Sequence, residues 1–337
     1  MTTYSVFRAP PHERFRFWGL FAAALIFTLL TGCIGPSPKL IRQNLISPNP
    51  PQTGELHARF FGVSTVLISD GKTRLMVDGF FSRPGLGKLA AGRLESKLAR
   101  VQAALAAGEV SALDAVLVAH SHHDHALDSM AVADLKGATI FGSDSTRNIV
   151  MGQNPSFRRF REVRDGAKKK FGDFCVHFFE SPHSPCPLFP GTIAAPLASA
   201  ARLPDFKCAE NYTYLLRHPA GRILIVPSAN FSPGFLRGVK ADVVFLSVGL
   251  LGKQKPEFIR QYWRETVPEV GAKLVVLIHW DDFTRPLAAS LRPMPYLFDN
   301  LNKSLPLLQE LARDDNVHLG FMPLYTPLGL AKYCGPP

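Results

Sequence analysis

Residue types that bind metals are concentrated in one short segment in the first half of the chain. Four histidines and one aspartate occupy six consecutive positions, in the order His120-Ser121-His122-His123-Asp124-His125. Imidazole and carboxylate groups are the ligands that zinc, iron and manganese take from proteins. In a loop at the end of a strand, His120 and His122 can turn to one side and hold one ion. Asp124 and His125 then face a position about 3.5–4 Å away, which is the separation of the two ions in dinuclear hydrolytic sites.

The elements expected around this segment alternate between strands and helices along the whole sequence. Residues 115–119 form an apolar run typical of a strand buried on both faces, and the histidines follow its end. Other strands are predicted over residues 57–68, 74–77, 176–179, 212–217, 222–226, 242–248 and 273–278. Helices are predicted over residues 94–107, 257–270 and 297–312. This mixture indicates one layered α/β domain over residues 55–337.

The pattern His120-x-His122-x-Asp124-His125 resembles the signature of the metallo-β-lactamase superfamily, and the preceding strand lies where that family has one. Two further stretches, residues 61–65 and 77–79, are similar to the opening hairpin of the family. The resemblance extends over most of the chain after the N-terminal segment. It implies a four-layer αββα sandwich.

The same resemblance implies roles for residues far from the motif. His183 and His279 each follow a predicted strand, and they match the third histidine of the first metal site and the late histidine of the second. Asp78 is expected to order the metal loop from behind without binding an ion. Asp281 and Asp282 follow His279 closely and either support ligands in the same way or begin a solvated loop. His123 lies at a variable position of the family pattern and is not expected to bind a metal.

One position departs from the family pattern. The family usually has an aspartate between the third and last histidines, and its carboxylate bridges both metals. Here the stretch is Val226-Pro227-Ser228-Ala229-Asn230, with Asn230 or Ser228 at the expected place. A neutral amide oxygen binds a divalent ion less strongly than a carboxylate and does not offset the repulsion between two cations. We therefore expect a weakly held second ion, with Asn230 as a candidate ligand.

These residues predict a metal-dependent hydrolase that uses one or two divalent ions, with zinc favoured and manganese or iron left open. Asp124 is expected to orient the attacking water as well as to bind a metal. Residues 62–65 and 279–281 resemble the branch that contains ascorbate-6-phosphate lactonases and N-acylphosphatidylethanolamine-hydrolysing phospholipases D. The expected substrate is a phosphodiester, an ester or a lactone. The alternative is a metal-binding envelope protein that keeps the fold without turnover, and the missing aspartate favours it.

The N-terminus has the features of a bacterial export signal. Three arginines precede an apolar run over residues 18–30, which is shorter than the roughly 20 residues that span a bilayer. Leu30-Thr31-Gly32-Cys33 then resembles the lipobox of bacterial lipoproteins. The resemblance implies removal of residues 1–32, lipidation of Cys33 and a tether over residues 33–54. It also implies a periplasm-facing envelope protein, with Ile34 after the cysteine favouring the outer membrane over the inner.

The net charge indicates which substrates and surfaces the protein can bind, and the cysteine content indicates which disulfides it can form. The net charge is +11, and loss of three Arg and one Glu with residues 1–32 leaves +9. Such a charge suits a lipid-like or small anionic substrate and a membrane surface. The basic cluster at residues 158–170 lacks the aromatic spacing of a nucleic-acid platform and is interpreted as a solvated loop. Four cysteines follow Cys33, and Cys186 with Cys208 is the favoured disulfide. The sequence leaves the oligomeric state open.

Overall fold

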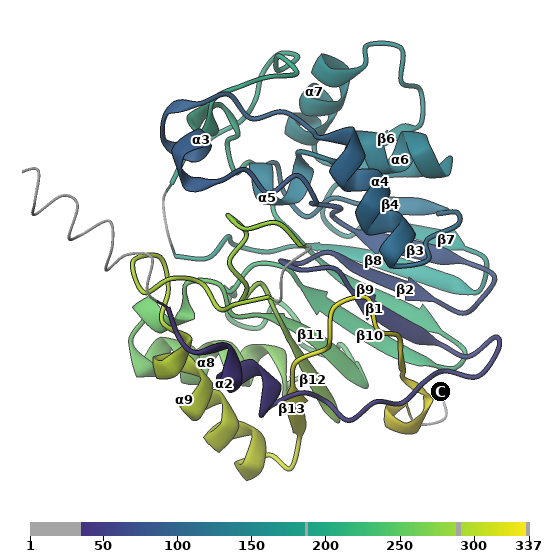
Figure 1. The fold of residues 1–337 in the computed structure, drawn as a ribbon. Helices are drawn as coiled ribbons and strands as arrows, with labels where there is room; N and C mark the ends of the chain where they lie inside the picture. Colours follow the sequence, from purple (N-terminus) through teal and green to yellow (C-terminus); the bar gives the residue numbers. More distant parts are fainter. Residues whose placement is uncertain (1–34, 186–187, 288–290, 335–337) are drawn as a thin grey trace, which may run out of the picture.

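Two mixed β-sheets form the centre of the protein in the computed structural model, which describes residues 35–185, 188–287 and 291–334 (Figure 1). The first sheet has the order β14-β1-β2-β3-β4-β5-β6. Its strands are β1 (His57–Phe60), β2 (Val66–Ser69), β3 (Arg74–Val77), β4 (Ala115–Leu117), β5 (Thr139–Gly142), β6 (Phe160–Glu162) and β14 (Leu328–Gly329). The second sheet has the order β13-β12-β11-β10-β9-β8-β7. Its strands are β7 (Lys168–Phe171), β8 (Phe174–Glu180), β9 (Tyr212–His218), β10 (Gly221–Val226), β11 (Val243–Ser247), β12 (Leu274–Ile278) and β13 (His318–Gly320).

Strand direction decides which loops meet. In the first sheet β3, β4, β5 and β6 are parallel to one another. In the second sheet β10, β11, β12 and β13 are parallel. Strand β8 runs in the same direction as β10, because both are antiparallel to β9. The carboxyl-terminal ends of β8, β10 and β12 therefore lie at the same end of the second sheet. The carboxyl-terminal ends of β3 and β4 likewise lie at the same end of the first sheet.

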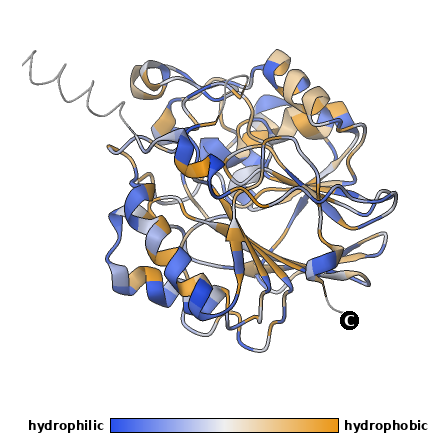
Figure 2. Ribbon diagram, turned by 60° about the horizontal axis from the view of Figure 1, so that its bottom comes forward, coloured by the Kyte–Doolittle hydropathy of each residue, from blue (hydrophilic) through white to orange (hydrophobic). Residues whose placement is uncertain are grey.

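Helices cover the outer face of each sheet. The first sheet is covered by α4 (Leu98–Ala107), α6 (Ser129–Lys136) and α7 (Asp144–Gln153), and the second by α8 (Pro256–Thr266) and α9 (Leu301–Asp314) (Figure 1). Blue and orange residues alternate along these helices, as expected when one helix face rests on a core (Figure 2). The shorter helices are α2 (Pro38–Arg42), α3 (Leu86–Ala91), α5 (His123–Ala126), η1 (Leu203–Asp205), η2 (Leu251–Lys253) and η3 (Ala331–Tyr333).

Two hydrophobic cores follow from the alternation of side chains along the strands. On β2, Val66 and Ile68 belong to the core between the sheets, which continues through the second sheet to α8 and α9. Leu67 points the other way and packs in the core beneath α4 and α6. A strand turns successive side chains to opposite faces, so a sheet buried on both sides needs this continuous apolar sequence. The predicted four-layer αββα arrangement is confirmed.

Three local expectations differ from the structure. The predicted strand over residues 57–68 is two strands, because residues 61–65 form a turn in which Gly62 has a φ of +94°. The basic segment 158–170, expected to be a loop, contains the outermost strands β6 and β7, whose exposed Lys and Arg suit unpaired sheet edges. Helices α6 and α7 and strand β5 were not predicted.

The segment before the domain is partly docked on it. Residues 35–54, the described part of the expected tether, include α2, whose Ile41 is buried in the core. Leu45 forms an isolated bridge with Phe321, and the Asn49 side chain donates a hydrogen bond to the Gly329 carbonyl oxygen over 2.8 Å. This part is therefore held against the domain instead of hanging free. Residues 1–32 and Cys33 lie outside the described residues. No helix in the described part of the chain has the length and hydrophobicity needed to cross a bilayer.

Candidate metal centre

The metal-binding residues predicted from the sequence meet at one end of the two sheets. The motif loop begins at His120, just after β4, and its last residues form α5. His183 follows β8 and His279 follows β12. Because the carboxyl ends of these strands lie at the same end of the sandwich, residues up to 159 positions apart in the sequence become neighbours. The described residues contain three groups of possible metal donors, and two of these groups lie here; the third, Asp70, Asp173 and His218, contains none of the predicted residues.

The first cluster contains His120, His122 and His183, with donor atoms within 4.8 Å of one another. His120 Nε2 lies 3.2 Å from His122 Nδ1, and the His183 ring centroid lies 4.7 Å from that of His120. His122 Nε2 contacts the Leu188 carbonyl oxygen at 3.2 Å, and His183 Nδ1 contacts the Ser184 carbonyl oxygen at 3.0 Å. Each of these two rings can donate its proton to a carbonyl, which leaves its other nitrogen available as a ligand.

The electrostatics of this cluster favour neutral imidazoles. Burial lowers the pKa of His122 to about 4 and that of His183 to about 3, and the neighbouring histidines contribute to both shifts. Burial and the adjacent rings also hold the pKa of His120 well below its usual range. Neutral imidazole is the form that binds metal ions. The neutral imidazole nitrogens of these three histidines converge, and such a set can bind a divalent ion.

The second cluster contains Asp124, His125 and His279. The His279 Nε2 atom lies 3.4 Å from Asp124 Oδ2 and 3.3 Å from His125 Nε2. Burial alone would raise the pKa of Asp124, but the neighbouring histidines, His125 foremost, hold it well below its usual range. Asp124 is therefore an anion at neutral pH. Two nitrogens and one carboxylate oxygen converge here, which is a donor set that zinc, iron and manganese accept.

Asp78 supports the second cluster from behind. Its Oδ2 atom accepts a hydrogen bond from His125 Nδ1 at 2.8 Å, and its Oδ1 atom accepts one from the Ala119 backbone amide at 2.8 Å. The Ser64 hydroxyl also donates to Oδ2. Burial works against a charged His125, but Asp78 and Asp124 raise its pKa. Asp78 thus fixes the ring so that Nε2 faces Asp124 and His279.

A buried ion pair holds the loop that carries His279. Arg83 Nη2 and Asp281 Oδ2 lie 2.6 Å apart with both side chains fully buried. Asp281 Oδ1 accepts a hydrogen bond from the Val63 amide at 2.7 Å, and the Val63 carbonyl accepts one from the His279 amide at 2.6 Å. A side chain on Gly62 would collide with Arg83, so this turn requires glycine. Asp281 therefore positions His279 through the backbone, and Arg83 is a functional residue that no sequence pattern indicated.

The Asn230 side chain is hydrogen-bonded to the backbone beside His183 and beside itself. Its Nδ2 donates to the His183 carbonyl oxygen at 2.6 Å, and its Oδ1 accepts from the Phe231 amide at 2.8 Å. The Ser228 hydroxyl accepts a hydrogen bond from the Ser184 amide at 2.9 Å. Both side chains are used to hold the loop around His183. Asn230 as a metal ligand stays a prediction, and Oδ1 keeps a second lone pair for such a role.

Cys208 is a potential donor that the sequence analysis did not place here. It belongs to the first cluster together with the three histidines. Burial, with a contribution from Asp124, raises the pKa of its thiol to about 12 in the absence of a metal. Its expected disulfide partner, Cys186, lies outside the described residues. No CxxC spacing marks Cys208, so only its spatial position indicates a role.

Comparison with known proteins agrees with this arrangement. Residues 58–184 match the family model described as the metallo-beta-lactamase superfamily. A metal-dependent hydrolase from Veillonella parvula can be superposed with a TM-score of 0.52 at 14% identity, over 82% of this chain and 99% of that one. A metallo hydrolase from Ignicoccus hospitalis gives 0.51 at 14% identity, over 79% and 94%. The chain has the metallo-β-lactamase fold. The family model matches residues 58–184, which include the predicted motif at residues 120–125.

Curated relatives match a smaller part of this metallo-β-lactamase-fold chain. A UPF0173 metal-dependent hydrolase from Thermus thermophilus is 35% identical over 85 residues, which is 25% of this chain. A relative of the same description from Heliobacterium modesticaldum is 34% identical over 88 residues, or 26% of this chain. The chain aligns with only 30% of the length of each relative.

A largely apolar pocket opens over both clusters of the metallo-β-lactamase-fold domain. Its cavity volume is about 360 Å³, and His122, Asp124, His183 and His279 contribute to its lining. The apolar part of the wall consists of Leu86, Leu89, Ala90, Leu188, Phe189, Leu203, Leu250, Phe283, Met294 and Phe298. Among the described residues, no Lys or Arg lines this pocket. The arrangement places reactive metal ligands beside space for a hydrocarbon group.

His123 belongs to the pocket wall and to neither cluster. Its ring packs edge-on against Phe80, Phe206 and Phe283, with centroids 5.8 to 6.3 Å away. Its Nε2 is buried and has no hydrogen-bond partner among the described residues. Burial lowers its pKa. His123 is therefore a neutral imidazole packed within the wall of the pocket.

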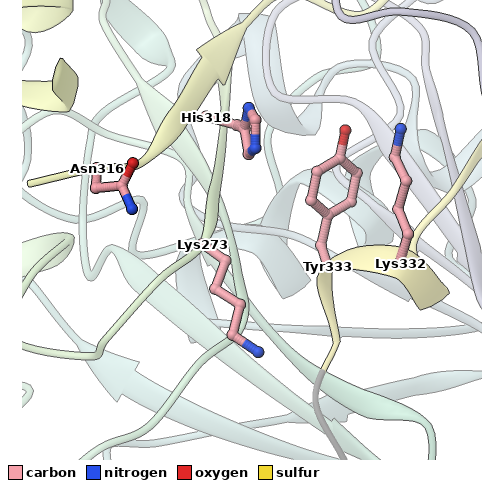
Figure 3. Close-up of a pocket in the computed structure, with 5 residues that line it drawn as sticks. All are labelled: Lys273, Asn316, His318, Lys332 and Tyr333. Carbon is pink, nitrogen blue, oxygen red and sulfur yellow. The ribbon is translucent and has the colours of Figure 1, made fainter.

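A second cavity lies at the opposite ends of the parallel strands. Figure 3 shows its lining residues, Lys273, Asn316, His318, Lys332 and Tyr333. Lys273 precedes β12, whereas His279 follows the same strand, so the length of the strand separates this cavity from the metal centre. The described residues that line this cavity supply two ammonium groups and one imidazole, and none of them carries a carboxylate. It lacks the donor set for a divalent metal, and we place the functional site at the other end.

Proposed function

We propose that this protein is a metal-dependent hydrolase that cleaves an ester, lactone or phosphodiester bond in a molecule with an apolar part. The observation that carries the proposal is the convergence of two metal-ligand clusters on the floor of an apolar pocket. Titratable groups with shifted pKa values that lie in an apolar pocket are the usual mark of a reactive site. Names of the curated relatives and the family match support the reaction class.

The residues of the two clusters have different roles in such a site. Divalent ions bound here supply activation of water and stabilisation of negative charge on the substrate oxygen. His120, His122 and His183 hold one ion, and His125 and His279 hold the other with Asp124. The Asp124 carboxylate also faces the pocket, where it orients the attacking water and can return a proton to the leaving group. Asp78 and Asp281 keep the histidine rings in place.

The pocket wall supports a lipid-like substrate. A hydrocarbon chain gains about 0.8 kcal/mol for each buried CH₂ group, and the ten apolar wall residues offer such burial. With no Lys or Arg in the described lining, negative charge on a substrate can be neutralised only at the metal centre. This combination suits one polar, cleavable group next to an acyl or alkyl chain. The resemblance to the branch with lactonases and phospholipases D agrees with this substrate class.

The proposed envelope location agrees with the geometry of the pocket rim. Gly35 packs against residues 293–295, and Met294 of that stretch lines the pocket. Leu188 in the lining and Leu297 between two lining residues each have 59% of their surface exposed. A lipid on Cys33, two residues before Gly35, would emerge beside the mouth of the pocket. The protein would then take its substrate from the membrane surface on which it is anchored.

A substrate panel tests the hydrolase proposal. Zinc- or manganese-loaded protein is offered bis-p-nitrophenyl phosphate, p-nitrophenyl esters of increasing acyl length, and lactones, with and without a chelator. We expect turnover that the chelator removes and that rises with acyl length for the preferred class. His318→Ala, which changes the second cavity, is the matched histidine control and should leave turnover unchanged. Stoichiometric metal binding without chelator-sensitive turnover on any compound would instead favour the non-catalytic envelope protein.

The anchor has its own test. Cells expressing the full chain are fed labelled palmitate, and the protein is recovered and examined for label. We expect label on the parent chain and none on Cys33→Ala, with the Cys33→Ala protein released from membranes. Label that persists in Cys33→Ala, or its absence from the parent, would contradict the envelope proposal. The hydrolase proposal does not depend on that result.

A further inference from the structure

Cys208 completes a set of four donors in the first cluster. Its sulfur and one nitrogen each from His120, His122 and His183 lie within 4.8 Å of one another. Tetrahedral Zn–N and Zn–S bonds of about 2.1 and 2.3 Å place the donors of one zinc ion about 3.4–3.6 Å apart. Side-chain rotations that draw the more distant of these four atoms together would close them round one ion. Imidazole nitrogen and thiolate sulfur are both zinc ligands, and four protein donors complete a tetrahedral site.

The motif loop itself holds Cys208 in this position. Ser121, which lies between two histidines of the motif, donates a hydrogen bond from its amide to the Cys208 carbonyl oxygen at 3.3 Å. Its hydroxyl donates to the Lys207 carbonyl oxygen at 2.5 Å and lies 3.1 Å from the Cys208 carbonyl oxygen. On the other side, the Cys208 amide donates to the Phe189 carbonyl oxygen at 2.9 Å. The backbone of Cys208 is thus fixed between the metal loop and a wall of the pocket.

Charge balance gives an independent reason for a thiolate here. The two predicted ligand sets contain a single anion, Asp124, to balance two divalent cations. The stretch where the family places a bridging carboxylate has Ser228 and Asn230, and both are hydrogen-bonded to the loop of His183. A buried cation pair with one counter-charge is strongly unfavourable. A thiolate at Cys208 would supply the missing negative charge from a different part of the chain.

We infer that Cys208 is the fourth protein ligand of the first metal ion, in place of the carboxylate that this chain lacks. This inference rests on the metal-dependent function proposed above. The thiol loses its proton to solvent when the metal binds, so binding to the parent protein releases one more proton than binding to Cys208→Ser. Four protein donors are typical of tightly held structural zinc, and three of catalytic zinc. The first ion is then the firmly held one, and the second cluster is left with three donors.

X-ray absorption and cobalt substitution test the inference without any measure of activity. In the zinc-loaded parent protein we expect one sulfur scatterer at about 2.3 Å per first-site ion. The cobalt-loaded protein should show thiolate-to-cobalt charge-transfer absorption in the near ultraviolet. Both signals should disappear in Cys208→Ser, and first-site metal affinity should fall at least about tenfold, the lower bound for supporting residues of metal sites. Cys334→Ser and Cys175→Ser are the matched controls and should retain both signals.

The outcomes separate this inference from the proposed function. Loss of the sulfur signal in Cys186→Ser but not in Cys208→Ser would overturn it, as would a disulfide between these two cysteines in the isolated protein. Metal bound with nitrogen and oxygen scatterers alone would overturn the thiolate ligand and leave the hydrolase proposal standing. Failure of the parent chain to bind any divalent metal would overturn both. Circular dichroism of Cys208→Ser confirms that the compared proteins are folded.

Discussion

The two metal-ligand clusters are built in different ways, although they share one loop. Three imidazoles dominate the first cluster, and His120 Nδ1 is buried without a hydrogen-bond partner among the described residues. The second cluster is backed by carboxylates, with Asp78 on His125 and the Arg83–Asp281 pair behind His279. Support from outer carboxylates makes a ligand more basic and fixes its ring. Charged groups therefore orient the ligands of the second cluster, whereas backbone carbonyl oxygens orient His122 and His183 in the first.

Removal of one ligand from each cluster should have the largest effect. His122→Ala and Asp124→Ala should each lower turnover by roughly 10²–10³-fold or more, since each removes charge stabilisation from the reacting centre. Metal analysis of the purified variants should show loss of a different ion in each. Near-parental circular dichroism is expected for both. Parental turnover in either variant would mean that its cluster does not take part in the reaction.

Breaking the buried Arg83–Asp281 ion pair should have the next largest effect, which is on the stability of the fold. Arg83→Met leaves the Asp281 carboxylate buried without its partner, so the free energy of unfolding should fall by about 3–5 kcal/mol. Urea titration of the metal-loaded protein measures this change. Arg147→Met, which breaks an exposed pair with Asp144, should cost no more than about 1 kcal/mol. Equal effects of the two changes would contradict the special support of the second cluster.

Asp78→Asn is a smaller change that tests whether the carboxylate behind His125 strengthens metal binding in the second cluster. The amide has nearly the shape of the carboxylate but lacks the charge that holds His125 Nδ1. Loss of such an outer partner weakens metal binding by about 10–100-fold, and we expect this for one of two ions in a competition with a coloured chelator. Asp242→Asn, a buried carboxylate paired with Arg222 before β11 and outside every group of possible metal donors, is the control. A change in the affinity of both ions would show that the clusters are not independent.

The smallest expected effect is on the pH dependence of the metal-free protein. The folded-state pKa values of His122 and His183, about 4 and about 3, lie below the usual 6.5. Between these values the unfolded chain binds protons that the folded chain does not, so stability falls as the pH falls. From pH 7.5 to 5.5 we expect a loss of roughly 1 kcal/mol for each histidine. The raised pKa of His125 opposes this trend.

Chemical unfolding of the metal-free protein at the two pH values measures the loss. His183→Gln removes one of the two contributions and should show a correspondingly smaller decrease between pH 7.5 and 5.5. His125→Gln should show a larger decrease, because the opposing contribution is lost. If His183→Gln and the parent chain lose the same stability, the buried neutral state of the first cluster is not the cause.

Patterns among residues close together in the sequence predicted much of the fold and most of the metal-ligand candidates. The apolar run before His120 and the spacing within the motif predict a strand followed by a metal loop, because both features involve residues close together in the chain. The positions of His183 and His279 after strands also follow from local patterns. Their assembly at one place required only that the strands share a direction in each sheet, which the layered fold supplies.

Tertiary structure alone decided the rest, because the deciding contacts join residues far apart in the chain. Asn230 has a suitable side chain for a ligand, but its amide is used by the backbone around His183. Arg83 and Asp281 are 198 positions apart and form a pair that no periodicity reveals. Cys208 has no motif around it and reaches the histidines through a loop held by Ser121. The sequence determines which chemical groups the side chains carry, but tertiary packing determines which of these groups contact one another.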